Sequence, residues 1–170
     1  MAAGDIRPVH GSTTSGSGGL TSLGSSSTWL AGYEWFEVDI SSTPPRDVRH
    51  DGKIRVGTSP TANTEIRLYL VASNDGTNWP DVFDGTASAE TVTSEGVRDG
   101  FAKLAAIMRV DSTTSNRDYF YEFNAAAVFG GSLPKKYVVF VAHNTGVNLN
   151  STAGEHTYRY TPQYDNVEQA

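Results

Sequence analysis

Residues 135–144 read KKYVVFVAHN, and this short run says more about the fold than any other part of the chain. From Tyr137 to Ala142 every side chain is apolar or aromatic, and valine and aromatic residues favour the extended backbone of a β-strand. The run is apolar on both faces and follows Pro134. A strand of this kind has to be covered on both sides, so we expect it to be a central strand of a β-sheet.

Strands of the alternating kind are expected elsewhere in the chain. Within residues 28–40, Glu34, Phe36, Val38 and Ile40 alternate with Tyr33, Trp35, Glu37 and Asp39, which is the two-residue period of a strand. Asp51-Gly52 is typical of a tight turn, which predicts a hairpin of two short strands within residues 47–57. Pro162 lacks an amide hydrogen and fits best on an edge strand. The remaining expected strands are 64–73, which should cross the sheet centre, 117–123 and 156–164.

Two segments have helical features. The spacing of Leu104 and Met108 within residues 101–110 fits both a helical stripe and a strand face. We favour the strand, because the neighbouring segments are β. In NAAAVFGG (124–131), Asn124 is expected to cap a single helical turn that Gly130 or Gly131 ends.

The order of these segments predicts the fold class. About eight short strands separated by turn residues predict an all-β, two-sheet β-sandwich, of which the jelly roll is one arrangement. A chain of 170 residues fits one domain. We expect an extended N-terminal arm over residues 1–27, the sandwich over residues 28–164 and a C-terminal tail over residues 165–170.

The arm contains the Gly/Ser-rich stretch GSTTSGSGGLTSLGSSS (11–27). Such a stretch buries too little apolar area to offset a backbone ordering cost of roughly 1–2 kcal/mol per residue, so alone it should be disordered. A partner could order it, with Ile6, Val9, Leu20 and Leu23 as anchors that lie outside the core. The alternative is that the arm packs on its own domain.

Composition restricts the choice of partners and location. The net charge of −6 should repel nucleic acid and anionic membranes, so we expect neither as a partner. The absence of cysteine excludes disulfides, thiolate zinc sites and a cysteine nucleophile. Neither a secretory signal nor an apolar run long enough to span a membrane is present, which favours folding in a cytoplasm.

The acidic loop NDGTNWPDVFDG (74–85) is the strongest candidate for a metal site. Its Asp and Asn oxygens could gather around calcium, but their spacing does not match an EF-hand loop. Asp and Asn also suit tight turns, and we favour this structural interpretation. We therefore expect no metal and no cofactor.

Catalytic patterns are missing from the chain. His10, His50, His143 and His156 are far apart and form no metal-binding pair, and His50 and His143 are expected to be solvated or capping residues. No GxSxG, GxGxxG or GxxxxGK motif occurs. Carboxylates at Glu34, Glu37 and Asp39 could in principle hydrolyse glycosides, and Glu37 and Asp39 would share one face, which a solvated strand explains equally well. Arg49, Lys53 and Arg55 form a basic cluster that we interpret as at most a contact surface. We expect no enzymatic activity.

A resemblance suggests a function. NWPDVFDGTASAETVTSEG (78–96) together with FGGSLPKKYVVFVAHNTGVNLNSTAGEHTYRYTPQY (129–164) resembles small virion structural proteins of tailed bacteriophages, over roughly Trp29 to Tyr164. The resemblance implies a β-sandwich decoration (cement) subunit on the capsid, and less often a tail protein, without catalytic residues. It also implies assembly in the host cytoplasm, the virion as location, and the major capsid protein or another virion protein as partner, and we expect association with further copies of the chain.

A second resemblance favours a different function. SNDGTNW (73–79) is similar to turns in carbohydrate-binding β-sandwiches, in which an exposed Trp stacks on a sugar ring. The alternative is therefore a phage tail or receptor-binding module that recognises carbohydrate through Trp35 or Trp79. Exposed aromatic residues in a groove would favour this alternative, and an arm extended away from the sandwich would favour decoration of a capsid.

Overall fold

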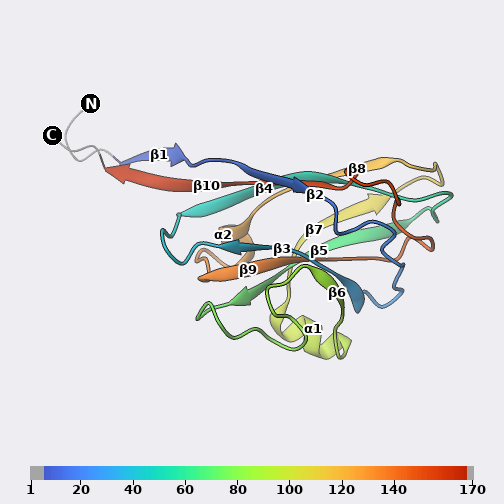
Figure 1. The fold of residues 1–170 in the computed structure, drawn as a ribbon, viewed down its shortest axis with the longest axis horizontal. Helices are drawn as coiled ribbons and strands as arrows, with labels where there is room; N and C mark the ends of the chain where they lie inside the picture. The colour runs from blue at the N-terminus through green and yellow to red at the C-terminus, as the bar shows by residue number, and fades with distance from the viewer. Residues whose placement is uncertain (1–5, 168–170) are drawn as a thin grey trace.

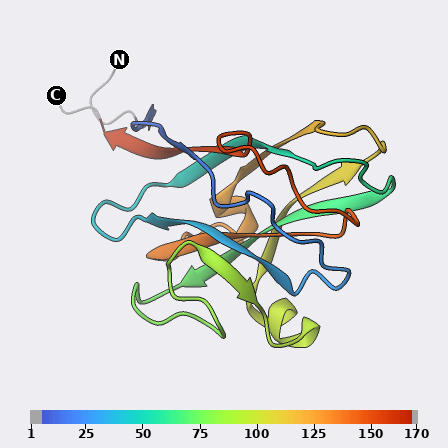
Figure 2. The same ribbon diagram turned by 45° about the vertical axis from the view of Figure 1, so that its right-hand side comes forward.

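The protein is an all-β sandwich of two antiparallel five-stranded sheets (Figures 1 and 2). The computed structural model describes residues 6–167. Sheet A has the order β1 (Ile6–His10), β10 (Thr157–Val167), β4 (Asp47–Arg55) and β8 (Asp118–Asn124), with β2 (Thr14–Ser17) also paired to β10. Sheet B has the order β6 (Ser88–Thr91), β3 (Ala31–Asp39), β9 (Lys136–His143), β5 (Thr64–Ser73) and β7 (Lys103–Val110). The predicted sandwich is confirmed with ten strands instead of about eight, while the jelly roll stays a prediction.

Strand β9 is the central strand of sheet B, as predicted. Tyr137, Val139 and Val141 point into the main core between the two sheets. Val138 and Phe140 point the other way, into a second apolar cluster on the outer side of sheet B. Both faces of β9 are therefore buried, which is why its sequence is apolar without alternation.

The second cluster lies between the outer face of sheet B and residues 74–102, which cover that face. This segment contains β6 and the short helix α1 (Glu95–Phe101), which lies beneath sheet B in Figure 1. The hydroxyl of Ser94 accepts a hydrogen bond from the Val97 amide and caps α1. The expectation of a strand within residues 101–110 is confirmed, because β7 begins two residues after α1 ends. Within residues 6–167, no comparable segment covers the outer face of sheet A.

Strand β4 corrects the predicted hairpin at Asp51-Gly52. The strand runs without a break from Asp47 to Arg55, paired with β10 on one side and β8 on the other. An added Cβ at Gly52 would collide with the carbonyl oxygen of Thr157 and the hydroxyl of Tyr121. Glycine is needed here for a close approach between strands, and not for a turn.

A second helix, α2 (Ala125–Val128), is the predicted single turn after Asn124. Asn124 occupies the N-cap position, but its side chain makes no capping hydrogen bond. The cap comes instead from β4, where the Asp47 carboxylate accepts a 2.8 Å hydrogen bond from the Ala126 amide. Gly130 and Gly131 have positive φ angles and lead the chain out of the helical turn.

From β2 onward the N-terminal segment packs on the sandwich, whereas β1 lies beyond the other strands, paired with the end of β10 (Figure 1). Its strands β1 and β2 pair with β10, and Leu20 is completely buried in the main core. The predicted boundary at Ser27 is therefore not a boundary of the packed structure, and β10 continues past the predicted end at Tyr164 to Val167. Pro162 lies in an inner strand, between the residues of β10 that pair with β1 and those that pair with β2. At this point the Gly11 amide donates a hydrogen bond to the Pro162 carbonyl. The side of Pro162 that lacks an amide hydrogen therefore faces the N-terminal segment.

None of the helices within residues 6–167 is long and apolar enough to cross a membrane.

Candidate functional site

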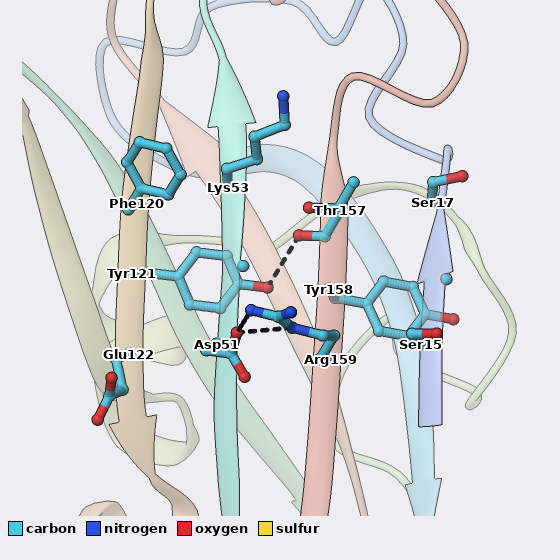
Figure 3. A pocket seen from close by; sticks show the side chains of 12 residues that line it. Ser15, Ser17, Asp51, Lys53, Phe120, Tyr121, Glu122, Thr157, Tyr158 and Arg159 are labelled. Carbon is cyan, nitrogen blue, oxygen red and sulfur yellow. Dashed lines mark hydrogen bonds and ion pairs between the residues drawn. The ribbon is translucent and has the colours of Figure 1, made fainter. Parts of the chain in front are cut away.

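The open outer face of sheet A carries a groove of about 780 Å³ that crosses four strands (Figure 3). Strand register places outward side chains in two rows, one on each side of the groove. From β8 to β2, the first row is Phe120, Lys53, Thr157 and Ser17. The second row, in the same order, is Glu122, Asp51, Arg159 and Ser15. We call this feature the sheet A groove.

The floor of the sheet A groove is a row of alternating tyrosine and glycine. In register, Tyr121, Gly52, Tyr158 and Gly16 lie side by side on β8, β4, β10 and β2. Their side chains point towards the core, and an added Cβ at Gly16 would come within 2.5 Å of the Tyr158 hydroxyl. The Tyr121 hydroxyl donates to the Thr157 carbonyl across Gly52, at 3.5 Å (Figure 3). Each ring occupies the space that its glycine neighbour leaves empty.

Charged side chains around the groove are paired with one another. Arg159 pairs with Asp51, Arg49 donates to Glu122 at 2.8 Å, and Lys53 lies 3.0 Å from Asp118. Hydrogen bonds from the Arg55 guanidinium lower the pKa of Asp118. The predicted basic cluster at Arg49, Lys53 and Arg55 is therefore paired with acidic residues, Glu122 and Asp118 on β8 and Glu155 in the loop before β10.

Phe120 is the most exposed large apolar side chain of the described chain. Its exposed fraction is 73%, and it stands at one end of the groove beside Lys53. Serine and threonine hydroxyls stand at the other end. The groove thus offers one aromatic face and several hydrogen-bonding groups, an arrangement suited to binding a ligand.

A second depression lies at one end of sheet B, beside the acidic loop, and we call it the Trp79 hollow. It has a volume of about 770 Å³. Aromatic rings of Trp79, Phe101 and Phe129 line it, together with polar side chains that include Asn78 and Lys103. Trp79 is half-buried, since it also packs against the second cluster.

The carboxylates of the acidic loop hold the loop itself. Asp75 accepts hydrogen bonds from the amides of Thr77 and Asn78 at 2.9 and 2.8 Å, which lower its pKa. Asp81 accepts from the Thr93 amide, and Asp84 from the Thr86 amide. Among residues 6–167, no group of three or more His, Asp or Glu side chains is arranged to hold a metal ion.

The predicted partner anchors divide into two pairs. Ile6 and Val9 are 67% and 42% exposed on β1. Leu20 is 0% exposed, and Leu23 is partly buried against the main core. The expectation that both leucines lie outside the core is wrong, because the Gly/Ser-rich segment crosses the end of the sandwich and inserts Leu20 between the sheets.

The predicted stacking residue Trp35 is also placed differently from the expectation. It is only 3% exposed, and its indole N–H donates to the Gly18 carbonyl at 2.6 Å. A bulge in β3 between Glu34 and Phe36 turns both Trp35 and Phe36 into the main core. Trp35 has no face to offer a ligand, whereas Trp79 does.

Three of the four histidines are fully buried, which corrects the expectation for His50 and His143. Burial lowers the pKa of His50 to about 3, and one ring nitrogen lies 2.8 Å from the Tyr137 hydroxyl. Burial likewise lowers the pKa of His143 to about 4 and lowers that of His156. Nε2 of His143 donates to the Leu23 carbonyl at 3.0 Å, so this ring helps to hold the N-terminal segment. His10 is exposed on β1.

Glu34 is an unusual residue whose burial sequence reasoning missed. It is 0% exposed; its Oε1 accepts a 2.7 Å hydrogen bond from the Gly85 amide, and its Oε2 has no partner among the described residues. Burial raises the pKa of Glu34 to about 7. The sequence did carry one signal for this burial: Glu34 occupies one position of a two-residue alternation whose other members are apolar. Glu37 and Asp39, by contrast, pair with Lys136 at 3.2 and 3.1 Å.

No protein-family model, no curated protein and no solved structure matches this chain.

Proposed function

We propose that the protein is a non-enzymatic structural subunit that attaches to a larger assembly through a ribbon formed by its two chain ends. The assembly that the sequence suggests is the particle of a tailed bacteriophage, with the protein as a decoration subunit that binds the major capsid protein or another virion protein and stabilises the outer shell. The observation that carries this proposal is the exposure of apolar side chains on the ribbon.

The terminal ribbon consists of β1 and the part of β10 paired with it, residues 163–167. It projects from one end of the sandwich beyond the other strands (Figures 1 and 2). Arg46 holds its base, donating its amide to the Gln163 carbonyl and pairing with Asp165 at 3.3 Å. The ribbon therefore has a defined direction relative to the sandwich.

Apolar side chains lie on both faces of the ribbon. Ile6 and Val9 differ by an odd number of positions and so point to opposite faces. Both are exposed on the surface of their own domain. Apolar residues exposed on both sides of a projecting element support insertion into a partner surface.

The free edge of β1 is protected against uncontrolled pairing. The Gly11 amide donates a hydrogen bond to the Pro162 carbonyl. Every second residue of β1, counted back from Gly11, therefore directs its amide and carbonyl groups towards β10. Pro8 is one of the residues in between, whose backbone groups face the free edge of β1. Because proline has no amide hydrogen, this edge lacks a hydrogen-bond donor at Pro8. A proline there opposes open-ended strand addition, which favours attachment through side chains at a defined site.

The proposal can be tested on virus particles released by the strain that carries the gene. We expect mass spectrometry to find the protein in purified particles at a fixed ratio to the shell protein. Added back to stripped particles, Ile6→Ser/Val9→Ser should bind at least ten-fold more weakly, because burying such a side chain contributes roughly 1.5–3 kcal/mol.

The matched control is Leu104→Ser/Ile107→Ser, which changes two side chains of similar exposure, 46% and 49%, on β7. This variant should bind normally. Absence of the protein from purified particles would overturn the virion proposal, and equal binding by both double variants would overturn the role of the ribbon. Sedimentation of the free protein would test the expected self-association.

A second function, carbohydrate recognition by a tail or receptor-binding module, is favoured by the Trp79 hollow. Trp79 lies where an aromatic ring is accessible inside a depression with polar groups, which matches the chemistry of sugar binding. Screening the full chain on a glycan array tests it, with loss of any signal in Trp79→Ala as the expected result. An array with no signal above background would contradict this function.

A further inference from the structure

We infer that the Trp79 hollow binds a sugar residue that carries a carboxylate, with Lys103 as its charge partner. The inference rests on carbohydrate recognition as the second proposed function and names the class of sugar. It follows from the ring surfaces, the amide side chains and the unpaired cation that three separate segments bring to one depression.

The apolar wall of the hollow comes from segments far apart in the chain. Trp79 belongs to the acidic loop, Phe101 ends α1, and Phe129 follows α2, with Leu133 beside it. The C–H face of a pyranose is apolar and packs against such rings, while its edge carries hydroxyl groups. A hollow with three rings therefore offers a stacking surface for one sugar residue.

The rings are held in place by their own packing. Phe101 meets Phe83 edge to face at 5.7 Å between ring centroids, and Phe129 meets Tyr137 at 5.5 Å. Trp79 lies over Gly85, where an added Cβ would be 3.2 Å from the indole ring. A ligand would thus meet a surface that is already formed, and ordering the site costs little binding energy.

The polar groups of the hollow suit sugar hydroxyls. The exposed side chains of Asn74 and Asn78 line it, and each amide both donates and accepts hydrogen bonds. The Nδ2 of Asn78 donates to Asp75 at 2.6 Å, which fixes the orientation of the amide and leaves its carbonyl oxygen available. The loop therefore presents hydrogen-bonding groups in a fixed geometry.

Lys103 supplies a cation without a partner. It is exposed, lines the hollow and forms no ion pair with any residue between 6 and 167. Lys53 and Lys136, by contrast, each lie close to two carboxylates.

Asp75 also lines the hollow, but hydrogen bonds from two amides and the Asn78 side chain already occupy its oxygens. Lys103 is the one cationic side chain among the residues that line the hollow, so its ammonium is the group that can form an ion pair with a ligand carboxylate.

Matched ligand pairs test the inference. Sialyllactose and lactose differ in one acidic sugar, and methyl glucuronide and methyl glucoside differ in one carboxylate. Titration of the full chain, followed by amide chemical shifts, should give at least ten-fold tighter binding of the acidic member of at least one pair. Trp79→Ala should abolish binding, and the preference should fall as salt is raised.

Lys103→Gln is the decisive variant, because this exposed side chain can be changed without disturbing the core. It should lower affinity for the acidic ligand at least five-fold and leave the neutral ligand unaffected. Phe120→Ala, which removes an exposed ring on the other sheet, should bind normally.

Equal binding of acidic and neutral ligands would overturn the inference and leave carbohydrate recognition standing. Failure of every sugar to shift the resonances of the hollow would overturn both.

Discussion

Polar side chains enclosed in an apolar setting carry the most distinctive chemistry of this protein. Glu34 lies on the outer side of sheet B opposite Phe140, inside the second apolar cluster. The cost of burying its charge exceeds the stabilisation from the Gly85 amide, so the neutral acid is favoured up to about pH 7. Burial of the three histidines shifts their pKa values in the opposite direction and keeps them neutral as well.

Substituting Glu34 by Gln should stabilise the protein at alkaline pH. The folded pKa of about 7 lies above the ordinary value of 4.5, so the stability that Glu34 contributes is present below pH 4.5 and is lost as the pH rises through 7. Glu34→Gln removes this loss. We expect a free energy of unfolding higher than that of the parent by up to about 3 kcal/mol at pH 8, and little difference at pH 5.

Urea denaturation of both proteins at the two pH values measures this effect. Glu122→Gln serves as the control, because its carboxylate is 60% exposed and paired on the surface. A Glu34→Gln variant whose stability follows the same pH dependence as the parent would show that Glu34 ionises normally.

Leu20 should behave as a core residue although it lies in a Gly/Ser-rich segment. Its side chain is fully buried between the sheets. Leu20→Ala should therefore lower the free energy of unfolding by about 2–5 kcal/mol, because it removes buried apolar area and leaves a cavity. In thermal melts, Leu104→Ala at a 46% exposed position should change stability by less than about 1 kcal/mol. Similar melting temperatures for the parent and Leu20→Ala would place Leu20 outside the core in solution.

At the scale of secondary-structure elements, sheet A depends on glycine and tyrosine alternating between neighbouring strands. The space above Gly52 is filled by Tyr121 and the Thr157 backbone. Gly52→Ala should therefore cost about 1–3 kcal/mol, because the new methyl group has to displace backbone or a buried ring. The row also explains why an Asp-Gly pair lies in the middle of a strand.

Gly100→Ala is the matched control for this substitution. An added Cβ at Gly100 meets nothing within 4 Å, and the residue lies inside α1. Alanine should stabilise the helix there by up to about 1 kcal/mol. Opposite signs for the two variants in chemical denaturation would support the packing argument, and a neutral Gly52→Ala would refute it.

At the scale of the whole molecule, the N-terminal segment closes one end of the sandwich. The Leu149 amide donates to the Leu23 carbonyl, and the Ser26 amide donates to the His143 carbonyl at 2.7 Å. Trp35 and His143 donate side-chain hydrogen bonds to the same segment. Residues 18–27 therefore belong to the folded unit, whereas β1 belongs to the projecting ribbon.

Two truncations should separate these roles. Deletion of residues 1–12 removes β1 and should leave a cooperative fold with stability within about 1 kcal/mol of the parent, since none of residues 6–12 belongs to the buried core. Deletion of residues 1–27 removes Leu20 and leaves the Trp35 indole N–H without its partner, so the sandwich should lose most of its stability. Circular dichroism melts and size-exclusion chromatography measure both. A stable, cooperative fold without residues 1–27 would restore the boundary expected from the sequence.

The periodicity of apolar side chains along the sequence by itself determines the architecture of this protein. The unbroken apolar run of β9 identifies a doubly covered central strand, and alternation in β5, β8 and β10 identifies most of the remaining sheet. These signals succeed because the pattern of a strand follows from which of its faces is buried. The turn sequence around Trp79 also indicates an accessible aromatic ring there. Composition likewise excludes disulfides and thiolate metal sites outright.

Only the tertiary structure decided the features that depend on residues from distant segments. Leu20 becomes a core residue because the end of the sandwich is open at that point, and Gly52 is required by rings on neighbouring strands. Glu34 is enclosed because a one-residue bulge in β3 changes the face on which it lies and residues 74–102 cover that face. The sheet A groove and the Trp79 hollow each combine residues more than fifty positions apart. Local sequence cannot encode such neighbours, because burial and charge pairing depend on which segments meet after the chain has folded.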